Sequence, residues 1–262
     1  VRAYTKELEQ KSLELTRATT ELREANARLR ELDRMKDDFI STVTHELRTP
    51  LTVLTGYIEL FEQDPELPEY LLGPLQQSRE QAARMQQIIS DMLALSRLES
   101  QETTPLMGNR IDVPAMLESS IQAIRDTLAS DTHHLETQIE PDLCVCGSEK
   151  DINSVITNLL ANAVKHTPVG TTIRIHWEST DDGQACLSII DNGPGIPEKH
   201  LPHLTERFYR VDEGRSRASG GTGLGLAIVK HVMQWHNGKL TITSKPGNTE
   251  FKAYFPAKRV LD

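Results

Sequence analysis

The chain has 262 residues, enough for two compact domains, and combines 37% hydrophobic and 26% charged residues with a formal net charge of −9. This composition excludes a disordered chain and argues against nucleic acid as a partner, and no stretch has the roughly 18 consecutive apolar residues of a membrane-spanning helix. Three cysteines cannot build a disulfide framework, which favours a reducing cytoplasm, and Val1 in place of an initiator methionine predicts an excerpt of a longer chain.

Residues 1–34 are predicted to form a coiled-coil helix. They contain no glycine or proline, and leucines recur every seventh residue at Leu8, Leu15, Leu22 and Leu29. The second seam position, which gives alternating three- and four-residue spacing, holds Tyr4, Lys11, Ala18, Ala25 and Leu32, all but Lys11 apolar or aromatic. A single solvated helix is the alternative. Because one helix cannot bury this leucine stripe alone, the pattern favours a parallel homodimer.

Residues 35–100 are predicted to form a helical hairpin that continues the same seam. Apolar residues keep helical spacing over Phe39–Phe61 and again over Leu71–Leu95, and the prolines of Asp64–Glu69 separate the two stripes. Two such hairpins, one from each subunit, would form a four-helix bundle.

His45 is the first residue with a chemical role in view. It follows the seam position Val43 by two residues, so helical geometry predicts a solvent-facing imidazole, which is a nucleophile when neutral. Glu46 could accept the proton of the other ring nitrogen, and Thr49 lies one helical turn further on. Pro50 predicts a kink beside them. A plain surface histidine is the alternative for this motif alone.

Beyond a polar linker at residues 101–109, strands and helices are mixed, which predicts an α+β domain over 110–262 with helices on one face of a mixed sheet. The predicted helices are Val113–Ala129, Glu149–His166, with Ser148 as its cap, and Leu226–Trp235. The predicted strands are Leu135–Ile139, Leu143–Cys146, Thr171–Glu178, Ala185–Asp191, Lys239–Thr243 and Glu250–Phe255.

The predicted helix over Glu149–His166 carries two asparagines that share one face. Asn158 and Asn162 are four residues apart, and amide oxygens are hard ligands that suit Mg²⁺. Lys165, three residues on, is placed to meet a phosphate. A merely polar helix face is the alternative.

Two glycine-containing motifs follow. In DNGPGIP, Asp191 ends an apolar strand and could accept a hydrogen bond from an amine such as adenine N6, while Gly193 and Gly195 permit close backbone approach; a plain turn is the alternative. In Ser219–Lys230, four glycines precede an amphipathic helix and form an anion site suited to phosphates. The charged segment between the two motifs, His200–Ser219, suits a mobile lid.

In their order, these motifs resemble those of bacterial two-component sensor histidine kinases. FISTVTHELRTPL resembles the H box, NLLANAVKHT the N box, DNGPGIP the G1 box, ERFYR the F box and GGTGLGL the G2 box, and the resemblance covers roughly Leu32–Pro256. It implies an all-α coiled coil and four-helix dimeric bundle, followed by an α+β ATP-binding domain, a two-layer sandwich of the Bergerat (GHKL) type.

The resemblance also implies roles for individual residues. His45 would be the phosphoacceptor, Glu46 its general base, and Thr49 the residue that orients water when the enzyme dephosphorylates its partner. Asn158 and Asn162 would hold Mg²⁺. The implied ATP-binding residues are Asn158, Asn162, Lys165, Asp191, Gly193, Gly195, Arg207, Arg210, Gly221, Thr222, Gly223, Leu224 and Gly225.

The implied partners are a second copy of the chain and the receiver domain of a response regulator, and the implied location is the cytoplasmic part of a membrane-anchored sensor whose sensor or transmembrane region lies upstream. One departure is Thr205, where the family usually has an aromatic that packs the lid, which predicts a less ordered lid without nucleotide.

Two other classes of protein share parts of this pattern. A dimeric scaffold would bind nucleotide without phosphorylating His45, but Glu46, Asn162 and Asp191 are all intact. A conformational ATPase of the gyrase kind would have no use for HELRTP on a dimeric helix.

Overall fold

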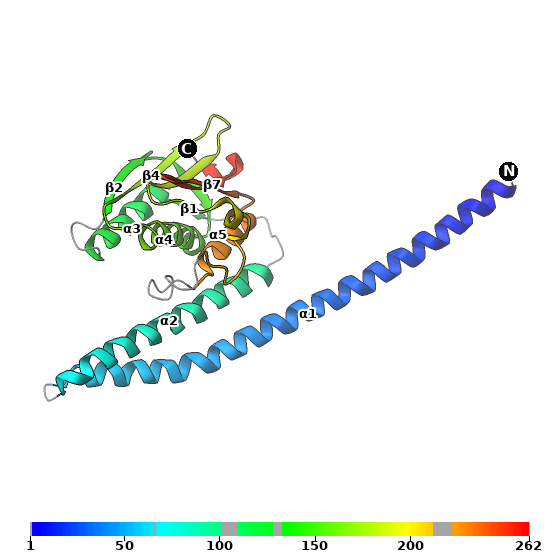
Figure 1. Ribbon diagram of the computed structural model, residues 1–262. Coiled ribbons are helices and arrows are strands. Elements are labelled where there is room, and N and C mark those ends of the chain that lie inside the picture. Colours follow the sequence, from blue (N-terminus) through cyan, green and yellow to red (C-terminus); the bar gives the residue numbers. More distant parts are fainter. Residues whose placement is uncertain (1, 65–66, 101–108, 128–132, 212–221, 262) are drawn as a thin grey trace.

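A computed structural model describes residues 2–64, 67–100, 109–127, 133–211 and 222–261. The chain forms a long helical hairpin, and an α/β unit is packed against the end of the second helix (Figure 1). We call residues 109–261 of this structure the catalytic unit. The predicted order, helices first and an α+β unit after them, is confirmed.

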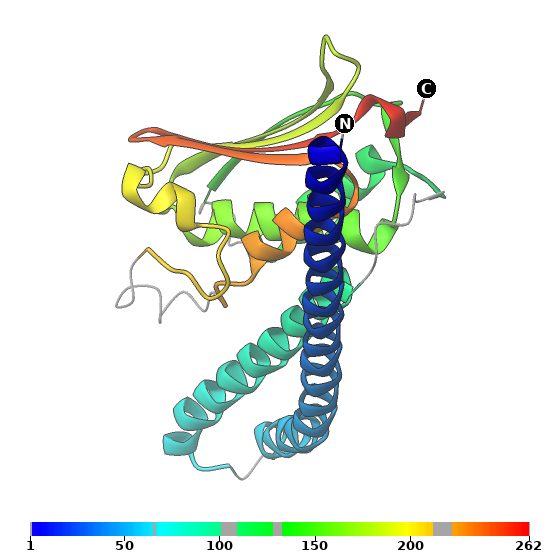
Figure 2. The same ribbon diagram turned by 90° about the vertical axis from the view of Figure 1, so that its right-hand side faces the viewer.

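The first helix, α1 (Arg2–Glu62), runs through Pro50 without interruption, and its N-terminal part projects away from the rest of the chain (Figures 1 and 2). The leucines of the predicted seam whose side chains are described are exposed, among them Leu15 at 70%. Within the described chain nothing covers this stripe, as expected for a surface that a second helix would bury.

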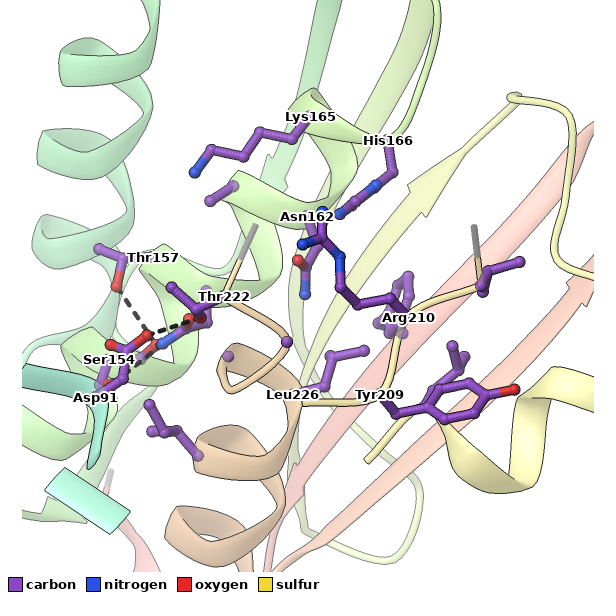
Figure 3. A pocket seen from close by; sticks show the side chains of 18 of the residues that line it. Asp91, Ser154, Thr157, Asn162, Lys165, His166, Tyr209, Arg210, Thr222 and Leu226 are labelled. Atoms are coloured by element: carbon purple, nitrogen blue, oxygen red, sulfur yellow. Dashed lines mark hydrogen bonds between the residues drawn. The ribbon is translucent and has the colours of Figure 1, made fainter. Parts of the chain in front are cut away.

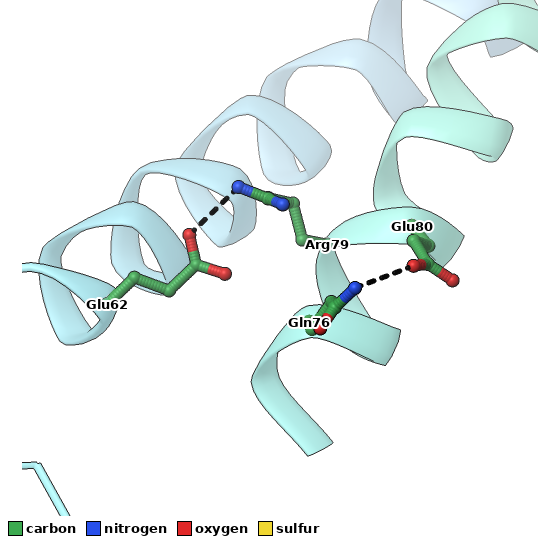
Figure 4. Close-up of polar contacts among 4 residues, drawn as sticks. All are labelled: Glu62, Gln76, Arg79 and Glu80. Atoms are coloured by element: carbon green, nitrogen blue, oxygen red, sulfur yellow. Dashed lines mark hydrogen bonds and ion pairs between the residues drawn. The ribbon is translucent and has the colours of Figure 1, made fainter. Parts of the chain in front are cut away.

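The second helix, α2 (Glu69–Ser100), returns antiparallel to α1 and fixes the register of the hairpin. Arg79 forms an ion pair with Glu62 at 3.3 Å (Figure 4), and Gln86 donates to the Thr55 hydroxyl at 3.4 Å. The two contacts are seven residues apart on both helices, so the pairing is constant.

The predicted apolar stripe Phe39–Phe61 is wider than the surface that α2 covers. Leu51 is buried against Ala82 and Ile89, and Ile58 is half-buried beside them. The stripe residues Leu47, Leu54 and Phe61, again seven residues apart, stay exposed. One hairpin therefore buries one side of the stripe and leaves the other side for another molecule.

The catalytic unit is built on a five-stranded mixed sheet in the order β2-β4-β5-β7-β6, with helices on one face (Figure 2). Strand β2 pairs parallel with β4, and the other pairs are antiparallel, which confirms both predicted hairpins. The strands are β2 (His133–Ile139), β4 (Thr171–Ser179), β5 (Ala185–Asp191), β6 (Lys239–Lys245) and β7 (Asn248–Phe255); the helices are α3 (Val113–Thr127), α4 (Glu149–Lys165) and α5 (Gly225–Trp235).

A second, three-stranded sheet was not predicted in full. It pairs β1 (Asn109–Ile111), β3 (Cys144–Gly147) and β8 (Val260–Leu261) in the order β1-β3-β8. Only β3 has a sequence signal, because strands of two or three residues are too short to show alternation. Asn109, predicted as the end of the linker, instead begins β1, and residues 101–108 lie outside the described part. Ser148 stands at the start of α4, but its side chain makes no capping hydrogen bond.

The core of the catalytic unit lies between the large sheet and its helices. Strand β4 alternates, with Ile173, Ile175 and Trp177 buried, whereas every residue of the central strand β5 is buried. Leu95 of α2, only 3% exposed, belongs to the same apolar cluster, so the end of the hairpin is anchored to this unit. Among the described residues, no helix has the length and apolar character to cross a membrane.

Candidate active site

His45 lies on the open surface of α1. Its side chain and that of Glu46 are both 78% exposed, and the Nδ1 and Oε1 atoms are 3.9 Å apart, close enough for attraction but beyond a hydrogen bond. The preceding Thr44 is buried, which turns His45 outward as predicted. Thr49 is also exposed. A solvent-facing imidazole beside a carboxylate is accessible both to a phosphate donor and to a protein partner.

A cavity of about 820 Å³ lies between α4, α5, the β5 end of the sheet and α2. Most of the predicted nucleotide-binding residues line it: Asn158, Asn162, Lys165, Asp191, Gly195, Arg210, Thr222, Gly223 and Gly225. Figure 3 shows Asp91, Ser154, Thr157 and Thr222 on one side of this pocket, with Asn162, His166 and Arg210 together on the other. The pocket volume suits a small organic ligand.

Asp191 closes the apolar end of the pocket. It is the last residue of β5 and is only 5% exposed, and its Oδ1 accepts the Gly193 N–H at 2.9 Å. Burial raises the pKa of this carboxyl group, while the Gly193 hydrogen bond lowers it. A Cβ atom on Gly193 would stand 2.7 Å from Asp191 Oδ1, and Gly195, with φ +80°, abuts the Lys245 backbone. Neither position has room for a side chain.

The asparagines of α4 fit a hard cation. The Asn158 amide nitrogen donates to the Ser154 carbonyl at 2.8 Å, which leaves its oxygen, the hard ligand atom, for another partner. The Asn162 amide nitrogen is buried and has no partner among the described residues. A buried N–H donor without a partner is costly, so the Asn162 nitrogen points to an acceptor such as a phosphate oxygen, whereas the free Asn158 oxygen is the atom that suits a cation. The pair therefore fits a magnesium–phosphate group.

The glycine-rich turn before α5 touches the segment that carries ERFYR. Gly223 has φ +72°, and a Cβ there would come within 2.8 Å of the Phe208 backbone, while the Phe208 N–H donates to the Gly223 carbonyl at 2.9 Å. A Cβ on Gly225 would lie 2.5 Å from Asn158 Oδ1. The glycines thus let three motifs meet at one end of the pocket.

Four predicted residues are placed differently. Arg210 lines the pocket, but Arg207 does not. Gly193 and Leu224 lie behind the lining, and Leu224 is fully buried in the core. Gly221 lies outside the described residues, as do residues 212–219 of the predicted lid. Thr205 is half-buried and lines a separate cavity of about 270 Å³.

Comparisons with known proteins match both parts of the chain. Residues 35–101 match the family described as His Kinase A (phospho-acceptor) domain, and residues 147–259 match that of histidine kinase-, DNA gyrase B- and HSP90-like ATPases. The chain belongs to the two-component sensor histidine kinases.

A similar relative is the phosphate regulon sensor protein PhoR of Pseudomonas aeruginosa, 42% identical over 237 residues that cover 90% of this chain and 53% of PhoR. The chain spans about half the length of the curated relatives it resembles here. The Acinetobacter baumannii histidine kinase AdeS superposes with a TM-score of 0.57 and 25% identity, covering 82% of this chain and 98% of that one. Full-length ShkA, solved in complex with AMPPNP, gives 0.69 at 23% identity, covering 84% and 45%, and so supports the fold alone.

Some residues of the pocket wall were not predicted from the sequence. Ser154 precedes Asn158 by one turn on the same face of α4, a spacing that could have been used. Asp91, Gln87 and Ser90 lie on α2, far away in sequence from the N and G boxes, and no local pattern connects them to a pocket. The ATP-binding domain therefore receives part of its wall from the phosphoacceptor hairpin.

Proposed function

We propose that this chain is the catalytic portion of a sensor histidine kinase in which His45 takes the γ-phosphoryl group of ATP and passes it to an aspartate of a response regulator. The observation that carries the proposal is the presence on one chain of an exposed histidine with an adjacent carboxylate and of an ATPase-type pocket that ends in an orphaned asparagine amide.

Different residues of the pocket bind different parts of the nucleotide. Asp191 receives the adenine amine, while the backbone around Gly223 and Gly225 and the side chains of Lys165 and Arg210 receive the phosphates. Asn158 and Asn162 would hold Mg²⁺, which neutralises charge on the phosphate oxygens when bound.

His45 then attacks the γ-phosphorus in line. The bond from Nε2 to phosphorus forms as the bond to the ADP oxygen breaks, and Glu46 takes the Nδ1 proton. Because His45 does not line the pocket, the γ-phosphate reaches it only after the catalytic unit moves along the bundle, or from the pocket of the other subunit.

The rest of the organisation is proposed from the same resemblance. The domains are a coiled-coil signalling helix (1–34), a dimerising phosphotransfer hairpin (35–100), a linker that ends before Asn109, and the ATP-binding domain that begins with β1, together forming the cytoplasmic part of a membrane-anchored sensor. The regulator docks below His45, where Val53, Leu54 and Tyr57 are exposed. Thr49 orients the water that removes phosphate from the regulator.

Incubation of the purified chain with γ-labelled ATP tests the proposal. The wild type should acquire label that is lost in acid and stable in base, as a phosphoramidate is. His45→Gln should abolish labelling while ATP affinity, measured by calorimetry, stays normal. Acid-stable label, or label that persists in His45→Gln, would show that the acceptor lies elsewhere.

A further inference from the structure

Asp91 is a buried carboxylate of α2 whose outer partner belongs to the catalytic unit. It is 7% exposed. Its Oδ2 accepts the Thr222 hydroxyl at 2.9 Å, and its Oδ1 accepts the Gln87 amide at 2.7 Å (Figure 3 shows the Thr222 contact). The contact joins residues 131 positions apart in the chain and links the hairpin to the glycine-rich turn.

The groups around Asp91 are the same ones that were assigned above to the phosphates of the nucleotide. Thr222 begins the turn that leads into α5, and its hydroxyl also accepts the Leu224 N–H at 3.2 Å. Asp91, Thr222 and Lys165 line the same pocket. Burial raises the pKa of Asp91, while the hydrogen bonds from Gln87 and Thr222 and the positive charge of Lys165 lower it. A carboxylate and a triphosphate are both anions, so they repel each other while sharing these partners.

Apolar packing holds α2 to the catalytic unit independently of this contact. Leu95 is fully enclosed in the core of that unit, and Met92 and Leu98 pack against it. Loss of the Asp91–Thr222 hydrogen bond therefore releases the glycine-rich turn without detaching α2.

We propose that Asp91 competes with the nucleotide phosphates for the glycine-rich turn: its carboxylate holds Thr222 against α2 in the nucleotide-free chain and gives it up when a triphosphate binds. The inference rests on the proposed function, because it takes ATP as the ligand of this pocket. By linkage, the position of α2 sets the affinity for ATP, and ATP weakens the hold of α2 on the turn to the same extent. The hairpin that carries His45 thus senses whether the pocket is filled.

Asp91→Asn tests the part of the carboxylate charge in this competition: asparagine keeps an acceptor for Thr222, so a change in ATP affinity comes from the lost negative charge and from the weaker hydrogen bond that a neutral acceptor makes. Calorimetric titration should show ATP binding about tenfold tighter than in the wild type, the scale of one like-charge repulsion relieved near a protein surface. Adenosine, which lacks phosphates and keeps the contact at Asp191, should bind with unchanged affinity. Glu80→Gln is the matched control: it removes one negative charge from an exposed position on the same helix and should change neither ligand (Figure 4).

Gln87→Leu provides a second variant: it removes the donor that orients Asp91, changes one side chain of the pocket wall, and should tighten ATP by a smaller factor. Equal ATP affinity in Asp91→Asn and wild type, or equal tightening of ATP and adenosine, would overturn the competition and leave the proposed function standing. A wild-type chain that binds no ATP would overturn both.

Discussion

The hairpin and the catalytic unit treat apolar side chains in opposite ways. In the described parts, large exposed apolar residues crowd α1 and α2, whereas the catalytic unit exposes Val169 and Phe208. The catalytic unit closes a continuous core, to which the end of α2 adds Leu95, but elsewhere the hairpin buries only a small cluster around Leu51 and Ile89. One part is complete as a single chain, and the other has the surface of half a bundle.

The same substitution in the two parts should separate these cases. Leu159→Ala, in the core of α4, should destabilise the catalytic unit by about 2–5 kcal/mol, which urea unfolding followed by tryptophan fluorescence measures, since both tryptophans lie in that unit. Leu15→Ala, on the seam, should leave that transition unchanged and lower the dimer fraction in light scattering.

Leu13→Ala is the matched control for the seam. Leu13 lies two residues from Leu15 and is also exposed, at 55%, but it is not a seam position. It should alter neither the unfolding transition nor the mass. A monomer mass for the wild type at micromolar concentration, or equal effects of the two leucine variants, would remove the claim that the hairpin needs a second copy.

Asp191→Asn tests whether a change in the catalytic unit alters ATP binding without altering the dimer. A charged acceptor lost from a buried base contact costs about 1.5–3 kcal/mol, so ATP should bind roughly ten- to a hundredfold more weakly while the dimer stays intact. Calorimetry and light scattering on the same sample check both. Unchanged affinity would move the adenine contact away from Asp191.

The roles proposed for Thr49 and Glu46 assign two activities to one turn of α1. Thr49→Ala should keep autophosphorylation within a few-fold and lose regulator phosphatase activity by about ten- to a hundredfold, because one water-positioning hydrogen bond disappears. Glu46→Gln should slow autophosphorylation and spare the phosphatase, since only the attack by His45 needs a base. Equal losses of both activities in both variants would assign the two residues to the shape of the helix near Pro50.

Periodic and motif-bearing segments were predictable from the sequence, and contacts between distant segments were not. The exposure of His45 was predicted correctly from its offset to Val43, although the buried neighbour in the structure is Thr44 and Val43 is exposed. The pocket residues of α4 follow from their four-residue spacing. Strands β1 and β8 were missed because pairing with β3, rather than local preference, makes them strands. Asp91 was missed for the same kind of reason, since its partner Thr222 lies far along the chain.

The prediction of an apolar stripe on α1 also met a physical limit. Sequence periodicity finds which face of a helix is apolar but not which neighbour covers each part of that face. In the structure, Leu51 contacts α2 while Leu54, three residues on, stays exposed. Which of the two leucines is buried depends on where the hairpin turn places α2. The ion pair between Glu62 and Arg79 shows this register.

The smallest expected effect concerns pH and belongs to the catalytic unit alone. His236 is fully buried after α5; its Nδ1 lies 2.8 Å from the Val232 carbonyl, and burial lowers its pKa below the ordinary value of 6.5. The fold thus favours the neutral ring, so the stability it contributes is complete above pH 6.5 and is lost as the pH falls through the lower pKa of the folded state. Urea unfolding followed by tryptophan fluorescence should show that this group lowers the free energy of unfolding by up to about 1.4 kcal/mol per pH unit.

His236→Gln should be less stable at neutral pH, but its stability should decline less steeply between pH 6.5 and 5. His134→Gln, at an exposed position on β2, should keep the wild-type slope. His166, whose pKa is also lowered by burial and by Lys165 and Arg210, contributes equally in all three proteins, so their difference isolates His236. Equal slopes in all three would mean that protonation of the buried ring costs the fold nothing.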